Sequence, residues 1–93
     1  MVKIIGNDLM REGQKIGWIS GNDIFDGSGH KIGWFSSNDV YNRDGNKIGY
    51  VDGSYIRQVG SSAPILVQDN NKHVAGGAYS DICRAAIRLL IGD

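Results

Sequence analysis

Residues 22–53 contain one 16-residue motif twice, first as NDIFDGSGHKIGWFSS (22–37) and then as NDVYNRDGNKIGYVDG (38–53). An earlier copy, NDLMREGQKIGWISG (7–21), is one residue shorter. The Asn-Asp pairs recur at spacings of 15 and 16, whereas the Lys-Ile-Gly-aromatic runs recur at 16, so the missing residue lies in the middle of the first copy, where a turn tolerates length changes. Two apolar runs flanking a Gly/Asn/Asp-rich centre are typical of a β-hairpin.

The alternation of side chains predicts how each hairpin sorts its two faces. With the turn of the third hairpin at 43–46, Tyr41 would pair with Ile48 and Asn42 with Lys47. One face would carry Asp39, Tyr41, Ile48 and Tyr50, and the other Val40, Gly49 and Val51, with Lys47 near the turn. The first two hairpins sort in the same way. Because both faces are apolar, each hairpin must pack on its neighbours with one face and on a common centre with the other.

The two ends of the repeat region predict how a ring could close. Residues 3–5 stand where Trp18-Ile19-Ser20 stand in the next unit, so we expect an isolated strand that pairs with the end of the last hairpin and removes open sheet edges. In the fourth unit, residues 54–57 start a hairpin that is interrupted around Pro64. We expect the unit to resume as strand 65–68, a turn at 69–72 and strand 73–76.

Residues 79–92 change to a helical period. Ser80 is a plausible N-cap, and Asp81, Arg84 and Arg88 form one narrow polar stripe on an otherwise apolar helix of roughly 18 Å. Small residues on the helix and on the hairpins favour close approach; these are Ala85, Ala86, Gly17, Gly33 and Gly49. Three placements stay open: the helix lies in the ring, caps one mouth, or pairs with a neighbouring chain in an oligomer.

Composition limits the possible functions. A chain of 93 residues supports one domain, 1–93, and a single cysteine, Cys83, excludes an internal disulfide. The formal net charge of zero provides no general field for nucleic acid, and no apolar run reaches the ~18 residues of a membrane span. We therefore expect a soluble cytoplasmic protein that neither binds nucleic acid nor spans a membrane.

The GNDIxDxxGxKIGxxxx-like repeats, followed by an apolar helix, resemble the four-fold β-flower family over residues 3–77, most strongly at 22–53. The resemblance implies a mainly β, shallow closed barrel of four repeated hairpins, with the helix of 79–92 in or across the centre. The fold is distantly similar to the Tubby C-terminal and scramblase-like barrels. It implies no common activity, and no residue is carried over as a family active site.

The repeated aromatics and lysines are the candidate binding residues: Trp18, Trp34, Tyr50, Lys15, Lys31 and Lys47. Lysines converging on the axis could hold a phosphate-bearing ligand, but lysines beside turns usually project into solvent. Exposed aromatics could contact a ligand or partner, and packing between hairpins is the alternative.

The sequence offers little support for catalysis. The loop 42–46 lacks the carboxylates of a calcium site, and the spacing of His30, His73 and Cys83 suggests neither a nucleophile nor a metal site. We expect no cofactor and no enzymatic activity. The leading hypothesis is a binding or adaptor module for a protein partner. The alternative is a protein that holds a small anionic or lipid-like ligand at the axis; a phage-encoded inhibitor of a host system fits either.

Overall fold

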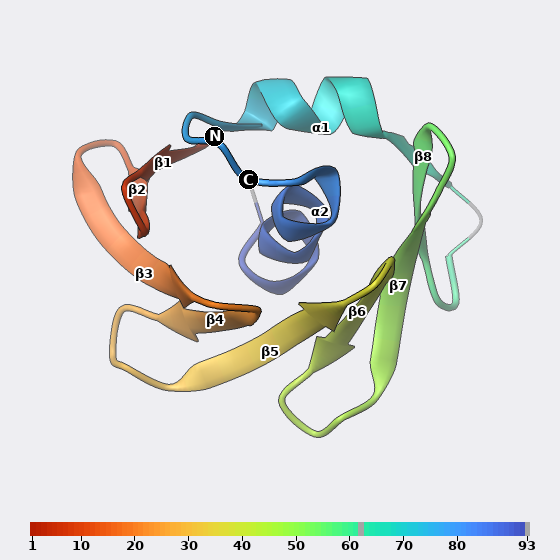
Figure 1. Cartoon of the computed structure of the whole chain (residues 1–93), viewed down its shortest axis with the longest axis horizontal. Coiled ribbons are helices and arrows are strands. Elements are labelled where there is room, and N and C mark those ends of the chain that lie inside the picture. The colour runs from red at the N-terminus through yellow and green to blue at the C-terminus, as the bar shows by residue number, and fades with distance from the viewer. Residues whose placement is uncertain (62, 93) are drawn as a thin grey trace.

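The structure, a computed structural model, describes residues 1–61 and 63–92 and consists of one curled sheet around a helix (Figure 1). The sheet order is β10-β1-β2-β3-β4-β5-β6-β7-β8-β9. The strands are β1 (Val2–Ile5), β2 (Asp8–Arg11), β3 (Gln14–Ser20), β4 (Asp23–Asp26), β5 (Lys31–Ser36), β6 (Asp39–Asn42), β7 (Lys47–Asp52), β8 (Tyr55–Gln58), β9 (Ile65–Leu66) and β10 (Val74–Ala75). The helices are α1 (Val67–His73) and α2 (Asp81–Leu90).

The three predicted hairpins are confirmed as the pairs β2/β3, β4/β5 and β6/β7, and each is followed by an antiparallel partner in the next unit. The sheet curls so that its inner face, the one that carries Leu9, Ile24 and Val40, surrounds α2. We call the opposite side the outer face. The strands before and after each turn thus build a continuous wall from consecutive segments of the chain.

The predicted pairing near each turn was wrong, because a β-bulge lies in the second strand of every hairpin. In the third hairpin Val40 pairs with Gly49 as expected, but Tyr41 pairs with Lys47 and leaves Ile48 as the extra residue. The turn is shorter than predicted, since the Asn42 N–H donates to Asn46 O at 2.9 Å and leaves only residues 43–45 between the two. A bulge places two successive side chains on one side of a strand. Ile48 therefore packs against the core, and Lys47 moves to the outer face.

The inner-face glycines allow both the sheet and α2 to pack closely. A Cβ on Gly33 would lie 2.4 Å from Tyr41 O and 2.7 Å from a Leu90 methyl, and one on Gly49 would lie 2.5 Å from Leu89. For a Cβ on Gly17 the nearest atoms belong to the neighbouring strand, with Phe25 O at 2.1 Å. Gly33 and Gly49 thus allow the close contact with the helix that the sequence predicted. Gly17 instead relieves crowding between neighbouring strands.

Helix α2 lies inside its own ring, which decides among the three placements for this chain. It is shorter than the predicted 79–92, beginning at Asp81 and ending at Leu90. Ser80 is the N-cap, and its hydroxyl accepts from the Cys83 N–H at 3.3 Å. The buried core combines strand and helix residues: Val2, Ile4, Leu9, Ile19, Ile24, Phe35, Val40, Val74, Cys83, Ala86 and Ile87.

The predicted fourth hairpin is wrong in its second half. Residues 67–73 form α1 instead of two strands joined by a turn, with β9 before and β10 after the helix. Val67, Asn70 and Val74 are all buried, and spacings of three and four residues place side chains on one side of a helix. That period is hard to see in the polar run QDNNKH.

The ring is completed by α1 rather than by hydrogen bonds between strands. The edges of the sheet are β9 and β10, and α1 connects them directly. The predicted role of the first strand is confirmed in part: β1 pairs with β10, in parallel, with Val2 opposite Val74. Hydrogen bonds thus do not close the sheet into the barrel expected from the sequence.

Arg84 departs from the predicted polar stripe, because it is only 9% exposed. Its guanidinium donates to Val74 O at 2.9 Å, Gly77 O at 3.1 Å and Tyr79 O at 3.3 Å. The planar fork of an arginine suits several carbonyls at fixed positions. Arg84 therefore holds the segment that leads from β10 into the centre of the ring against α2.

We predict that Gly33→Ala lowers the free energy of unfolding by about 1–3 kcal/mol, because the added methyl meets a backbone carbonyl that cannot move without shifting a strand. Gly27→Ala is the matched control. Its added Cβ has no atom nearer than 3.6 Å, and we expect a change within about 0.5 kcal/mol. Urea unfolding followed by circular dichroism measures both. Equal stabilities of the two variants would contradict this account of the inner face.

We predict that Arg84→Met lowers the free energy of unfolding by about 2–3 kcal/mol, because it leaves buried carbonyls without donors while keeping most of the side-chain volume. Arg43→Met, in an exposed turn, controls for the loss of a positive charge. Thermal and urea unfolding of both variants provides the comparison. An Arg84→Met protein as stable as the control would show that the three hydrogen bonds contribute little.

Candidate functional site

The outer face carries the same three-residue cluster on three successive hairpins. In each cluster the aspartate that begins the hairpin pairs across the strands with the aromatic residue, and the bulge places the lysine on the same face. Lys Nζ to Asp Oδ1 distances are 3.0, 3.1 and 2.9 Å. The clusters are Asp8-Lys15-Trp18, Asp23-Lys31-Trp34 and Asp39-Lys47-Tyr50, and we call them the outer clusters.

Each lysine in an outer cluster also lies over its aromatic ring. The Nζ atoms of Lys15, Lys31 and Lys47 lie 5.0, 4.8 and 4.7 Å from the ring centroids, within the range of a cation–π contact. The hydrogen bond from Lys47 to Asp39 raises the pKa of the Lys47 ammonium. The paired lysine and aspartate side chains are 33–48% exposed, and ion pairs so exposed typically contribute under about 1 kcal/mol to the free energy of unfolding. Their main effect is to fix side-chain positions on the surface.

The aromatics also stack on the next hairpin, as the packing alternative predicted. Trp18 stacks on Phe25 at 5.4 Å with an interplanar angle of 9°, and Trp34 stacks on Tyr41 at 5.5 Å and 20°. In the third cluster Arg57 takes the place of the second ring and pairs with Tyr50 across the strands. The rings remain partly exposed, so they both join hairpins and form part of the surface.

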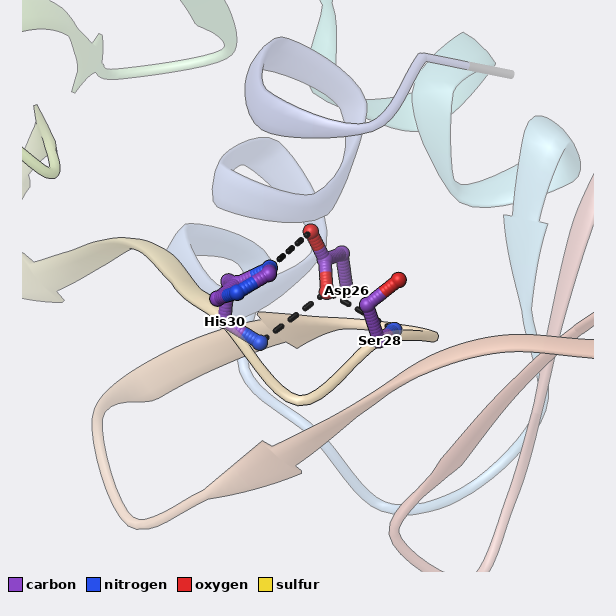
Figure 2. A network of polar contacts seen from close by, with 3 residues as sticks. All are labelled: Asp26, Ser28 and His30. Atoms are coloured by element: carbon purple, nitrogen blue, oxygen red, sulfur yellow. Dashed lines mark hydrogen bonds and ion pairs between the residues drawn. The ribbon is translucent and has the colours of Figure 1, made fainter.

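The turns of the second and third hairpins contain a feature that the sequence reasoning missed. Asp26 Oδ1 accepts from the backbone N–H groups of Ser28 at 2.9 Å and His30 at 3.0 Å, and Asp26 Oδ2 lies 3.7 Å from His30 Nδ1 (Figure 2). Asn42 accepts from Asp44 and Asn46 in the same way. The hydrogen bond from the His30 N–H is the main cause that lowers the pKa of Asp26. An Asp or Asn at the end of the first strand of a hairpin is the signal that could have revealed this cap.

The candidate lysines do not converge on the axis of the ring. Helix α2 occupies the centre, and Lys15, Lys31 and Lys47 lie on the outer face, each with its own aspartate. The lysines and aromatics are thus brought together, but in three separate places. The structure leaves the predicted axial anion site without its cations.

The residues considered for nucleophilic chemistry lie apart in the fold. Cys83 is buried in the core, and this burial raises the pKa of its thiol to about 11. His30 belongs to the turn between β4 and β5, and His73 is the last residue of α1. Within residues 1–61 and 63–92, no group of three His, Cys, Asp or Glu side chains could hold a metal ion.

A family model described as 4-fold beta flower protein matches residues 3–75, which include α1 and every strand except for Val2 of β1. The chain belongs to the 4-fold beta flower family. No curated protein and no solved structure matches it. The matched region of this β-flower protein ends before α2, so the helix that fills the ring lies outside it. Across the described ranges, no helix has both the length and the apolar character needed to cross a membrane.

We predict that Asp26→Ala destabilises the β-flower protein at neutral pH, whereas Asp26→Asn retains most of the stability, because Asn42 caps the next hairpin through the same two hydrogen bonds. The folded-state pKa of Asp26 lies below its ordinary value of 3.8, so its contribution as a carboxylate is complete above that pH and is lost as pH falls through the lowered pKa.

Urea unfolding of all three proteins between pH 2 and 7 tests this prediction. The difference between wild type and Asp26→Ala should shrink at the acid end, while the difference between Asp26→Asn and Asp26→Ala should not. An Asn variant that loses as much stability as the Ala variant at pH 7 would count against the cap.

Proposed function

We propose that this protein is a non-enzymatic binding module whose outer clusters contact a protein partner. The observation that supports it is the repetition of one partly exposed Asp-Lys-aromatic arrangement on three consecutive hairpins. The stacked rings of Phe25 and Tyr41 extend two of these clusters towards the next hairpin. A partner would meet a row of similar contacts along the outside of the ring.

The chemistry of the outer clusters fits protein recognition. Trp, Tyr and Arg are the residues most enriched at the energetic centres of protein interfaces, because they combine large apolar area with a polar group. Trp18, Trp34, Tyr50 and Arg57 supply these side chains here. Their conformations are already restricted by stacking and by the lysines above them, which reduces the entropy lost on binding.

The balance of charge in the clusters restricts the partner. Each lysine is paired with an aspartate, so the row presents alternating charges with no net field. Such a surface selects a partner through apolar contact and matched hydrogen bonds rather than through long-range attraction. A strongly charged polymer would gain little from it.

The non-enzymatic part of the proposal is supported by the state of the reactive groups. The Cys83 thiol is enclosed and has a raised pKa, so at neutral pH it is held as the unreactive thiol form. His30 is engaged in its own turn with Asp26. The polar groups of the outer clusters are arranged as ion pairs with each other, which suits a static contact surface.

We predict that the double variant Trp34→Leu, Tyr50→Leu captures at least tenfold less partner than the wild-type protein, because the central contacts of an interface carry most of its affinity. The measurement is quantitative capture from extracts of the source cells, with the folded β-flower protein as bait. Tyr55→Leu is the matched control, since Tyr55 is an exposed aromatic outside the outer clusters. Unfolding curves of each bait confirm that it is folded.

Two outcomes would overturn the proposal. One is that the double variant and the control retain the same proteins in the same amounts. The other is that the wild-type protein captures nothing above the level of the double variant.

A further inference from the structure

The outer face of the first hairpin breaks the pattern of the others. Lys3 pairs with Met10 there, in the register in which Trp18 pairs with Phe25, so a lysine and a methionine replace two stacked rings. A pocket of about 630 Å³ lies at this place, within the ~300–1,000 Å³ typical of small-molecule sites. Its lining includes Met1, Lys3, Ile5, Met10, Arg11 and Glu12.

One part of the pocket is apolar and accessible to solvent. Ile5 is 56% exposed and Met1 is 66% exposed, although both are large apolar side chains. Met10 lies beside them on β2. Methionine is unbranched and adapts its shape to a bound chain, so a wall with two methionines can close around an apolar ligand. Large apolar residues gathered at one exposed place point to a binding surface.

The other part of the pocket carries two cations without carboxylate partners. Lys15, Lys31 and Lys47 each pair with an aspartate, but neither Lys3 nor Arg11 forms an ion pair within residues 1–61 and 63–92. The Nε of Arg11 is shielded from solvent and has no hydrogen-bond partner in that part of the chain. A shielded donor without a partner costs free energy, and an oxyanion in the pocket would accept from the accessible donors of Lys3 and Arg11, which both line it.

The shorter turn of the first hairpin explains why Arg11 can occupy this position. Its counterparts Asp26 and Asn42 use their side chains to cap turns with three residues between hydrogen-bonded partners, 27–29 and 43–45. The first turn has only Glu12 and Gly13 between paired strands, at φ 51° and 79°, the geometry of a two-residue hairpin loop. Such a loop needs no side-chain cap. The residue missing from the first repeat thus coincides with a change from a capping group to a cation that lines the pocket.

We propose that this pocket binds a small anionic amphiphile, a single apolar chain that ends in a carboxylate or phosphate group. Lys3 and Arg11 hold the anionic end, and Met1, Ile5 and Met10 contact the chain. A bare anion would leave the apolar wall in water, and an uncharged chain would leave the two cations unpaired. This site is separate from the outer clusters and does not depend on the function proposed for them.

Isothermal titration calorimetry of the full chain tests this site with four probes below their micelle concentrations: decanoate, decyl phosphate, decanol and inorganic phosphate. We expect decanoate or decyl phosphate to bind at least tenfold more tightly than decanol and inorganic phosphate. The better of the two charged probes identifies the head group. The variants Lys3→Met and Arg11→Met should each weaken that binding about tenfold, consistent with the loss of one charge-assisted hydrogen bond of about 1.4 kcal/mol.

Arg43→Met is the matched control, because Arg43 lies in an exposed turn outside both the pocket and the outer clusters. It should bind the charged probe like the wild-type protein, and unfolding curves should show all three variants folded. If decanol binds as tightly as the charged amphiphile, the site is only an apolar surface. If inorganic phosphate binds as tightly, the site is only an anion site. Either result overturns the proposal, as does absence of binding or full affinity in Arg11→Met.

Discussion

The close approach of α2 to the inner face of the sheet is the constraint on which the rest of the structure depends. None of the hairpins has a core by itself; Leu9, Ile24 and Val40 become buried only because Cys83, Ala86 and Ile87 meet them in the centre. Gly33 and Gly49 leave room for the helix, and Ala85 and Ala86 keep the helix narrow. Arg84 then fixes the segment that carries the chain from the wall of the ring into its centre.

The repeated β-bulge connects this interior with the surface. In each hairpin it turns an isoleucine inwards and leaves the preceding lysine on the outer face, next to an aspartate and an aromatic ring. The partly buried isoleucines pack against the core and stabilise the fold, whereas the exposed ion pairs contribute little to it. The outer clusters can therefore serve recognition without being required for folding, and the first hairpin can depart from them at Lys3 and Met10 while its inner face stays intact.

Much of the fold could be predicted from the sequence, because a repeated motif fixes its own alignment. The hairpins, the inner positions of Val40 and Gly49, the Ser80 cap and the place of residues 3–5 all followed from spacing and alternation. The bulges could not be predicted, since the alternation rule assumes that each residue of one strand faces one residue of its partner and gives no sign of an extra residue. Helix α1 was missed because Val67, its first residue, and Val74, which follows it in β10, are separated by a polar run that resembles a turn. The aspartates and aromatics were predicted to share one face, but the lysines were placed on the other, because only the bulge brings each lysine to the face of its aspartate and aromatic ring.

The position of α2 in the chain has a consequence for synthesis. A growing chain emerges in order, so the wall of the ring leaves the ribosome before the helix that fills it. Until residues 81–90 are free, the apolar side of every completed hairpin faces water or another molecule. This domain therefore acquires its native interior in one late step, and its translation passes through an interval in which nascent chains can adhere to one another.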